Sequence, residues 1–372
     1  MLATSSLVRF LAGAAIGIAA LFYFYAGPVD PGTIALGTQT VEANESVDGL
    51  SITASRVGKL RSLVRELRAR PVPGRPVVLW LGNSQMHAIN QYRPGDHLAT
   101  YWLVNDVSCA LCLLPIGATI PNADIQEHYV LASYFISQIK TDLVVLELCF
   151  DDLREDGLRD EFELVMDDNT RKHLDRSVVG KQILTAWDAR AKVNPDAEEV
   201  AGLQGFVQRP VEKALVSGLG ALFPLWRARP YLRAELLDDL YWFRNWVFRI
   251  KPSTVRRMIA VRYERNMRAL ETLMEGVARD RIPMIAYIAP IRNDVSIPYE
   301  PAVYARWKDE VAALAARHGV TLLNLEALVP GNLWGSYHND DIDFMHFQGP
   351  GHQLVANALR PDVMRLLAAR GR

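Results

Sequence analysis

The sequence is poor in cysteine and carries almost no net charge. Three cysteines occur among 372 residues, at Cys109, Cys112 and Cys149, and all lie in apolar runs, so buried thiols are predicted and a disulfide framework is not. Cys109 and Cys112 have the spacing of half a zinc site. Because no second Cys or His pair follows at ligand spacing, neither a metal nor a cofactor is expected. Since 41 basic side chains balance 42 acidic ones, no nucleic-acid-binding surface is predicted.

The longest apolar run lies near the amino terminus. Residues 7–26 carry one charge, Arg9, and end in the aromatic residues 22–25. About 20 apolar residues suffice to cross the hydrocarbon core of a bilayer, and a cation on the short side favours a cytoplasmic tail, residues 1–6. We therefore expect a single-pass anchor in the cytoplasmic (inner) membrane, with the rest of the chain on the periplasmic or extracellular side. A cleaved signal peptide is the alternative, but the bulky residues before Ala26 make a poor cleavage site.

A linker and an amphipathic helix are predicted after the anchor. Residues 27–54 contain Pro, Gly and Thr without an apolar period, which is typical of a linker. Between 55 and 70, apolar residues recur every three or four positions, which predicts a helix with an Arg-rich face. That face either rests on anionic lipid headgroups or is simply solvated. The Pro-Val-Pro-Gly sequence at 71–74 ends the helix.

The next apolar run leads to a serine. Residues 77–81 are Val, Leu and Trp, as expected of a buried strand in a parallel sheet, and the run stops at Gly82-Asn83-Ser84. Parallel sheets of α/β proteins place their ligands at the carboxyl ends of the strands. Ser84 is therefore a candidate nucleophile, although Gly-Asn-Ser is also a common way to end a strand in a turn.

Strand and helix patterns alternate along the rest of the chain. Strand-helix-strand units of the observed length predict a parallel sheet with right-handed crossovers, in which all strand ends share one edge. The expected fold class is α/β, with a central, mainly parallel sheet whose first part lies in 55–152 and whose second part lies in 281–372. Strands are predicted at 106–115, 142–150, 281–290 and 320–325, and helices at 122–139 and 301–318.

Residues 153–280 interrupt this alternation. They begin with a charged stretch and continue with helical patterns, so a helical insertion is predicted. Within it, residues 219–250 are rich in Trp, Phe, Tyr and Arg. These aromatic side chains either pack a core, line a groove for an acyl chain or a glycan, or dock on a membrane or a partner.

A second polar motif lies near the carboxyl terminus. Asp343 and His346 are separated by two residues and precede a helical pattern. At the start of a helix or in a tight turn, residues three apart face the same side. An imidazole can take a serine proton while a carboxylate fixes its tautomer, so Ser84, His346 and Asp343 can form a catalytic triad. A polar surface loop is the alternative for this motif, and His87 and His352 are rival bases.

The order of these motifs resembles that of the SGNH (GDSL-type) hydrolase family. The anchor and the stretches LPIGATIPNADIQEHYVLASYF, FDDLRED and DFMHFQGPGH are most similar to its membrane-anchored DltD-like branch. The resemblance covers residues 76–155 and 280–360 and implies a three-layer, flavodoxin-like fold. Proteins of that branch accompany membrane-bound O-acyltransferases and help to modify cell-envelope polymers. The family's Gly-x-Asn-Asp block corresponds here to Leu-Cys-Phe-Asp at 148–151, which lacks the Asn.

The resemblance implies a role for each motif residue. Ser84 matches the nucleophile, His346 the general base and Asp343 the acid that orients it. The backbone N–H groups of Ser84 and Gly117 match the donors that stabilise the tetrahedral oxyanion. The side chain of Asn122 is a substitute for the missing Asn of the family's block.

Three functions follow from these assignments. The first is an outward-facing serine O-acyltransferase, which forms an acyl-serine and acylates a cell-envelope glycan or polymer, with a membrane-bound O-acyltransferase as partner. The second is an ester hydrolase (deacetylase) of the same substrate class. The third is a non-catalytic partner of a membrane O-acyltransferase.

Arg292, just after its strand, either holds an anionic group of the substrate or forms a surface salt bridge.

Overall fold

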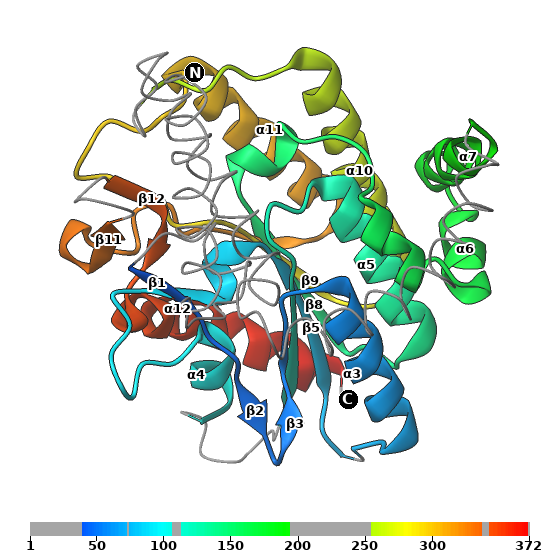
Figure 1. The fold of residues 1–372 in the computed structure, drawn as a ribbon, viewed down its shortest axis with the longest axis horizontal. Helices are drawn as coiled ribbons and strands as arrows, with labels where there is room; N and C mark the ends of the chain where they lie inside the picture. Colours follow the sequence, from blue (N-terminus) through cyan, green and yellow to red (C-terminus); the bar gives the residue numbers. More distant parts are fainter. Residues whose placement is uncertain (1–38, 73, 106–112, 194–253, 337–341, 371–372) are drawn as a thin grey trace, which may run out of the picture. The chain divides into compact units, whose positions relative to one another are not determined.

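The computed structural model describes residues 39–72, 74–105, 113–193, 254–336 and 342–370 (Figure 1). Nearly all of them belong to one compact unit, residues 38–187 and 251–372. The second unit, which includes the predicted anchor at 7–26, lies almost wholly outside the described residues. Within the described ranges, no helix is both long and apolar enough to cross a membrane.

Six parallel strands form the central sheet, in the order β10-β9-β8-β5-β7-β4. The inner strands are apolar and buried, as expected of a parallel sheet that is covered by helices on both faces. The predicted α/β class with a central parallel sheet is therefore confirmed. The strands are β4 (Thr53–Ala54), β5 (Val77–Gly82), β7 (Leu114–Thr119), β8 (Leu143–Leu148), β9 (Met284–Ile288) and β10 (Thr321–Asn324).

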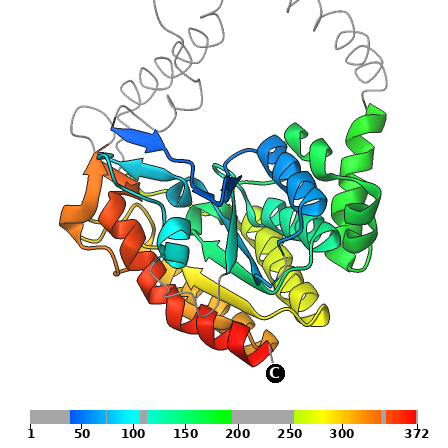
Figure 2. The same cartoon turned by 90° about the horizontal axis from the view of Figure 1, so that it is seen from below.

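Helices cover both faces of the sheet (Figure 2). Leu79 and Leu81 of β5 join one core cluster, while Val78 and Trp80 join another, because successive side chains of a strand point to opposite faces. The first cluster also contains residues of α3 (Val57–Ala69), α5 (Ile125–Gln138), α10 (Ala260–Arg279) and α11 (Pro301–His318). The second contains residues of α4 (Ala99–Asn105) and α12 (Gly349–Arg370). The unit thus has three layers, with the sheet in the middle.

The order in which the chain adds strands to the sheet changes direction at β5. Without the edge strand β4, the order β7-β5-β8-β9-β10 is the 2-1-3-4-5 order of flavodoxin-like sheets. The chain moves from β5 to β7 on one side and then crosses to β8 on the other, so the crossover helices α4 and α5 cover opposite faces. The carboxyl ends of β5 and β8 therefore form a topological switch point, where open α/β sheets bind their ligands. Ser84 directly follows β5 at this point.

The second core strand lies later in the chain than predicted. The sequence indicated a strand at 106–115, but β7 spans Leu114–Thr119, and residues 106–112 lie outside the described ranges. Gly117 is therefore inside the strand, opposite Trp80 of β5, and does not follow its end. The apolar run continues through both segments without a break, so the local pattern could not locate the strand within it.

The second half of the predicted linker, 27–54, is part of the folded unit. β1 (Thr40–Glu42) pairs antiparallel with β6 (Ala88–Asn90), which follows the serine turn. β2 (Ser46–Val47) and β3 (Leu50–Ser51) pair with each other, and β4 joins the edge of the central sheet. Strands of two or three residues are too short to show an alternating pattern, so their partners define them.

The flanks of the predicted insertion, 153–280, share the core of the sheet. Phe162 of η3 (Asp160–Val165), Leu174 of α6 (Asp168–Leu174) and Leu273 of α10 are all buried in the first core cluster. Helix α7 (Val178–Val193) follows α6. The aromatic stretch at 219–250 lies outside the described residues, as do Cys109 and Cys112.

Candidate active site

A tight turn after β5 presents Ser84. Asn83 caps the short 3₁₀ turn η1 (Ser84–Met86), because its side-chain oxygen accepts the backbone N–H of Gln85 at 2.9 Å. A Cβ at Gly82 would lie 2.5 Å from Met86 Sδ and 2.7 Å from Glu147 Oε2, so any larger residue would force these side chains to move. The glycine therefore lets the turn approach β8 closely, and Ser84 remains 9% exposed.

Asp343 and His346 lie on an irregular hairpin. β12 (Ile342–Phe347) pairs antiparallel with β11 (Trp334–Ser336), and the register shifts between the two ends of the pair. Within this irregularity, Asp343 Oδ1 accepts the backbone N–H groups of Met345 at 2.8 Å and of His346 at 3.0 Å. In a regular strand, residues three apart would face opposite sides. Neither predicted setting is observed: α12 begins only at residue 349, and both residues lie on the strand β12, where the two hydrogen bonds to Asp343 accompany the irregular pairing.

The serine, the histidine and the aspartate form one hydrogen-bonded chain. His346 Nε2 lies 2.9 Å from Ser84 Oγ, and His346 Nδ1 lies 2.9 Å from Asp343 Oδ2. An ionised carboxylate can only accept, so Nδ1 carries the proton and Nε2 is left to accept the serine hydroxyl. Burial opposes the charge of Asp343, but the imidazole and the two backbone N–H groups outweigh it and lower the pKa of this carboxyl. The structure thus brings the three predicted triad residues together.

Asn90 joins the hairpin to the segment that carries the nucleophile. It lies on β6, six positions after Ser84, and is fully buried. Its side-chain amide donates to Asp343 Oδ2 at 3.1 Å and to the carbonyl of Ser336 at 2.9 Å. Gly335 is required for this contact, because a Cβ there would lie 1.8 Å from Asn90 Oδ1. Asn90 therefore orients the carboxylate that orients His346.

Gln85 and Arg292 form hydrogen bonds that hold the same hairpin in place. Gln85 Nε2 donates to the carbonyl of Met345 at 2.8 Å, directly beside the nucleophile. Arg292 pairs with Asp294 at 2.8 Å and donates to the carbonyl of Gly335 at 2.8 Å. Its guanidinium thus forms the salt bridge that the sequence offered as the alternative to binding an anionic group of the substrate. The same side chain supports β11.

His87 and His352 do not reach the serine hydroxyl. Among the described residues, only His346 forms a hydrogen bond with Ser84 Oγ. Burial lowers the pKa of His87 to about 4. His352 forms a hydrogen bond with the carbonyl of Ala88 at 3.2 Å, and burial lowers its pKa to about 3. Both rings are therefore buried and neutral near pH 7.

One of the predicted oxyanion donors is available. Ser84 is the first residue of η1, so its N–H has no acceptor within the turn. The N–H of Gly117 instead donates to the carbonyl of Ile52 at 2.8 Å inside the sheet, which contradicts its predicted role. Asn122 is exposed in the turn between β7 and α5, with a φ of 52°, and no hydrogen bond joins it to the triad in the described part of the chain.

Several supporting residues were not predicted from the sequence. Gln85 and Asn90 are buried polar residues just after the candidate nucleophile, and Glu147 is a single acid within the apolar strand β8. A buried polar group needs a partner, so an isolated polar residue in an apolar run is the signal that could have identified them. Their partners lie far away in the sequence and could not be named from it.

The arrangement is suited to nucleophilic acyl transfer. His346 can accept the proton of Ser84 as the serine attacks a carbonyl carbon, and Asp343 can stabilise the imidazolium that forms. The described residues contain no group of three or more His, Cys, Asp or Glu side chains placed to hold a metal ion.

Replacing Asn90 with alanine should weaken catalysis through Asp343. A hydrogen bond to a charged group contributes about 1.5–3 kcal/mol, so we expect kcat for ester hydrolysis to fall about 10- to 100-fold. The loss should be in kcat, with KM little changed, because Asn90 lies behind the triad. Steady-state kinetics with a small activated ester measures this, and an unchanged kcat in a folded Asn90→Ala protein would contradict the role.

No protein-family model matches the sequence, and the comparison with curated proteins finds no match. Solved structures with a similar chain trace include a candidate acylhydrolase from Bacteroides fragilis, at 12% identity over 81% of this chain and 94% of that chain, with a TM-score of 0.37. A candidate platelet activating factor from Streptococcus pneumonia matches at 11% identity over 82% and 92%, with a TM-score of 0.38. An α/β hydrolase from the metagenome of Lake Arreo, Spain, matches at 12% identity over 79% and 95%, with a TM-score of 0.37. These are remote likenesses of the chain trace.

Proposed function

We propose that this chain is a serine-dependent acyl-transfer enzyme that works through an acyl-serine at Ser84. The observation that supports it is the hydrogen-bonded chain of Ser84, His346 and Asp343 at the switch point of the sheet. Ser84 Oγ attacks the carbonyl carbon of an ester while its proton passes to His346 Nε2, and the N–H of Ser84 binds the oxyanion. The intermediate then collapses to the acyl-serine, and His346 returns the proton to the departing alcohol.

The proposed acceptor of the acyl group is a hydroxyl of a cell-envelope glycan or polymer. In the second half-reaction this hydroxyl attacks the acyl-serine and gives its proton to His346, and the serine hydroxyl is restored. A missing oxyanion donor costs on the order of a hundredfold in rate, so a site with one assigned donor is suited to a slow or partner-dependent enzyme. The resemblance to the DltD-like branch supports the wider setting: an anchor at 7–26 in the inner membrane, a catalytic unit outside it, and a membrane-bound O-acyltransferase as partner.

The full-length protein in detergent separates transfer from hydrolysis. We expect slow hydrolysis of 4-nitrophenyl acetate in water and, when an envelope-glycan oligosaccharide is added, an acetyl increment in the mass of that oligosaccharide. Hydrolysis is slow because the acyl-serine reacts with the glycan hydroxyl in preference to water. Fast removal of acetyl groups from an acylated polymer by the chain alone would identify an ester hydrolase instead.

Variants in cells separate a catalytic role from a scaffolding one. Ser84→Ala and His346→Ala should abolish polymer acylation as completely as deletion of the whole chain does, with all variants present at wild-type amounts. If both variants are silent while deletion is not, the chain is a non-catalytic partner.

A further inference from the structure

Two buried carboxyls lie against the nucleophile turn. Glu147, on β8, accepts the backbone N–H of Asn83 through Oε2 at 3.0 Å. Asp152, in η2 (Phe150–Leu153), accepts the side-chain amide of Asn83 through Oδ1 at 3.2 Å. Asn83 is also the cap of η1, whose first residue is Ser84. One asparagine therefore links both acids to the nucleophile.

Neither carboxyl has a cationic partner at ion-pair distance among the described residues. Glu147 is 1% exposed and Asp152 is 4% exposed. The second oxygen of Glu147 receives a hydrogen bond from the hydroxyl of Tyr287 at 3.4 Å, and that hydroxyl accepts the indole N–H of Trp80 at 3.2 Å. A buried charge that is held only by neutral donors lowers the stability of a fold. Its presence beside a nucleophile indicates a role other than stability.

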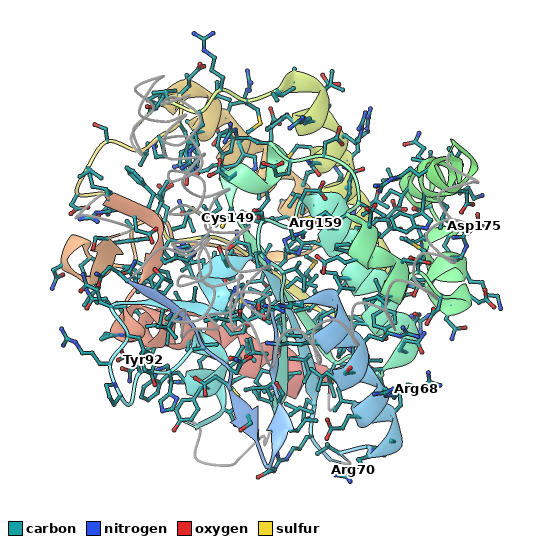
Figure 3. The ribbon with its side chains drawn as sticks, viewed as in Figure 1. Arg68, Arg70, Tyr92, Cys149, Arg159 and Asp175 are labelled. Carbon is teal, nitrogen blue, oxygen red and sulfur yellow. The ribbon has the colours of Figure 1, made fainter. Side chains whose placement is uncertain are left out.

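Burial raises the pKa of both acids. Burial raises the pKa of Glu147 to about 7, although the N–H of Asn83 opposes this shift. Burial and the charge of Glu147 together raise the pKa of Asp152 well above its ordinary value. Above its pKa of about 7, Glu147 is ionised. The titratable groups that face Glu147 are Tyr287 on β9, Cys149 directly after β8 (Figure 3), Asp152 in η2, and His346 on β12.

We propose that Glu147 is a positioning residue for acyl transfer. Through Asn83, its carboxylate holds the nucleophile turn where Ser84 reaches His346, and its charge favours the imidazolium that His346 becomes in the tetrahedral intermediate. The close approach of Glu147 to Gly82 and the hydrogen bond to Asn83 support the first part. The position of Glu147 beside the nucleophile turn supports the second, because a negative charge there favours a positive charge on the imidazole that Ser84 contacts. This inference rests on the proposed function.

The variant Glu147→Gln tests the proposal, because it keeps the shape and the acceptor oxygen but removes the charge. We expect kcat for 4-nitrophenyl acetate to fall about tenfold or more with KM little changed, as for an interaction made in the transition state. A raised pKa means that the folded state binds the proton more tightly, so the contribution of Glu147 to the stability of the wild type falls as pH rises from about 4.5 through about 7. The variant lacks this loss, and at pH 8 its melting temperature should exceed that of the wild type by about 2 °C or more.

Glu45→Gln is the matched control. Glu45 is also a buried carboxylate that accepts a backbone N–H, that of Leu98 at 3.0 Å, and it also pairs with His97 at 3.2 Å. In the described part of the chain, no hydrogen bond or ion pair joins Glu45 to the nucleophile turn. This control should keep the wild-type kcat. A Glu147→Gln protein with a lower melting temperature at pH 8 and a lower kcat would show a merely structural role and overturn the proposal, as would an unchanged kcat. If Ser84→Ala stays active, the proposed function itself fails; if Ser84→Ala is inactive while Glu147→Gln equals the wild type, only this inference fails.

Discussion

Replacement of Ser84 by alanine should abolish ester turnover and leave the fold intact. We expect kcat for 4-nitrophenyl acetate to fall about 10⁴-fold or more, because His346 and Asp343 then have no nucleophile to activate. Among the described residues the hydroxyl makes one hydrogen bond, to His346, so its removal should shift the melting temperature little. Initial rates and thermal unfolding of the same preparation measure both effects.

Ser62→Ala is the matched control for this prediction. Ser62 lies on the exposed side of α3, and its hydroxyl also makes one hydrogen bond, to the carbonyl of Gly58 at 3.1 Å. The control should retain full turnover. A folded Ser84→Ala protein with turnover within about tenfold of the wild type would contradict the assignment of the nucleophile.

The variant Asp343→Asn should have the second-largest effect. Asp343 accepts hydrogen bonds from His346 Nδ1, from Asn90 and from two backbone N–H groups. An amide has one acceptor oxygen instead of two, so its N–H₂ group would replace an acceptor of Asp343. That group would then face one of the present donors, or it would favour the other imidazole tautomer, in which Nε2–H points at Ser84. By analogy with other Ser-His-Asp sites, kcat should fall on the order of 10³- to 10⁴-fold. Steady-state kinetics provides the measurement.

Asp167→Asn controls for the loss of a charged cap. Asp167 also accepts a nearby backbone N–H, that of Thr170 at 2.9 Å, at the start of α6. Because asparagine is an equally good cap, this variant should keep both its fold and its turnover. If Asp343→Asn retained a kcat within about threefold of the wild type, the carboxylate would not be orienting the base.

The place of the nucleophile could be predicted from local sequence. The apolar run before Gly82 predicts a strand, and the turn-forming residues after it predict where the strand ends. The observed strand β5 covers the predicted run. The same holds for the long helix α11, which spans the predicted 301–318. Such elements depend on the periodicity of their own residues, which a single sequence displays.

The supports of the site could not be predicted, because they depend on pairing between distant segments. Ser84 and His346 are 262 positions apart, and His346 and Asp343 come together where the pairing of the strand β12 with β11 is irregular. Asn90 stands on β6, whose partner β1 comes from the segment predicted to be a linker. The same limit explains the error at Gly117, since the register of β7 against β5 and β4 sets that strand's position, and no local signal does.

Detection of the acyl-serine at Ser84 tests the proposed function most directly. Full-length wild type mixed briefly with 4-nitrophenyl acetate, quenched in acid and digested should yield one acetyl increment, on the peptide that contains Ser84. The increment should be absent from Ser84→Ala and strongly reduced in His346→Ala, because the hydroxyl is a weak nucleophile without its base. An acetyl group on another residue, or an increment that persists in Ser84→Ala, would contradict the account.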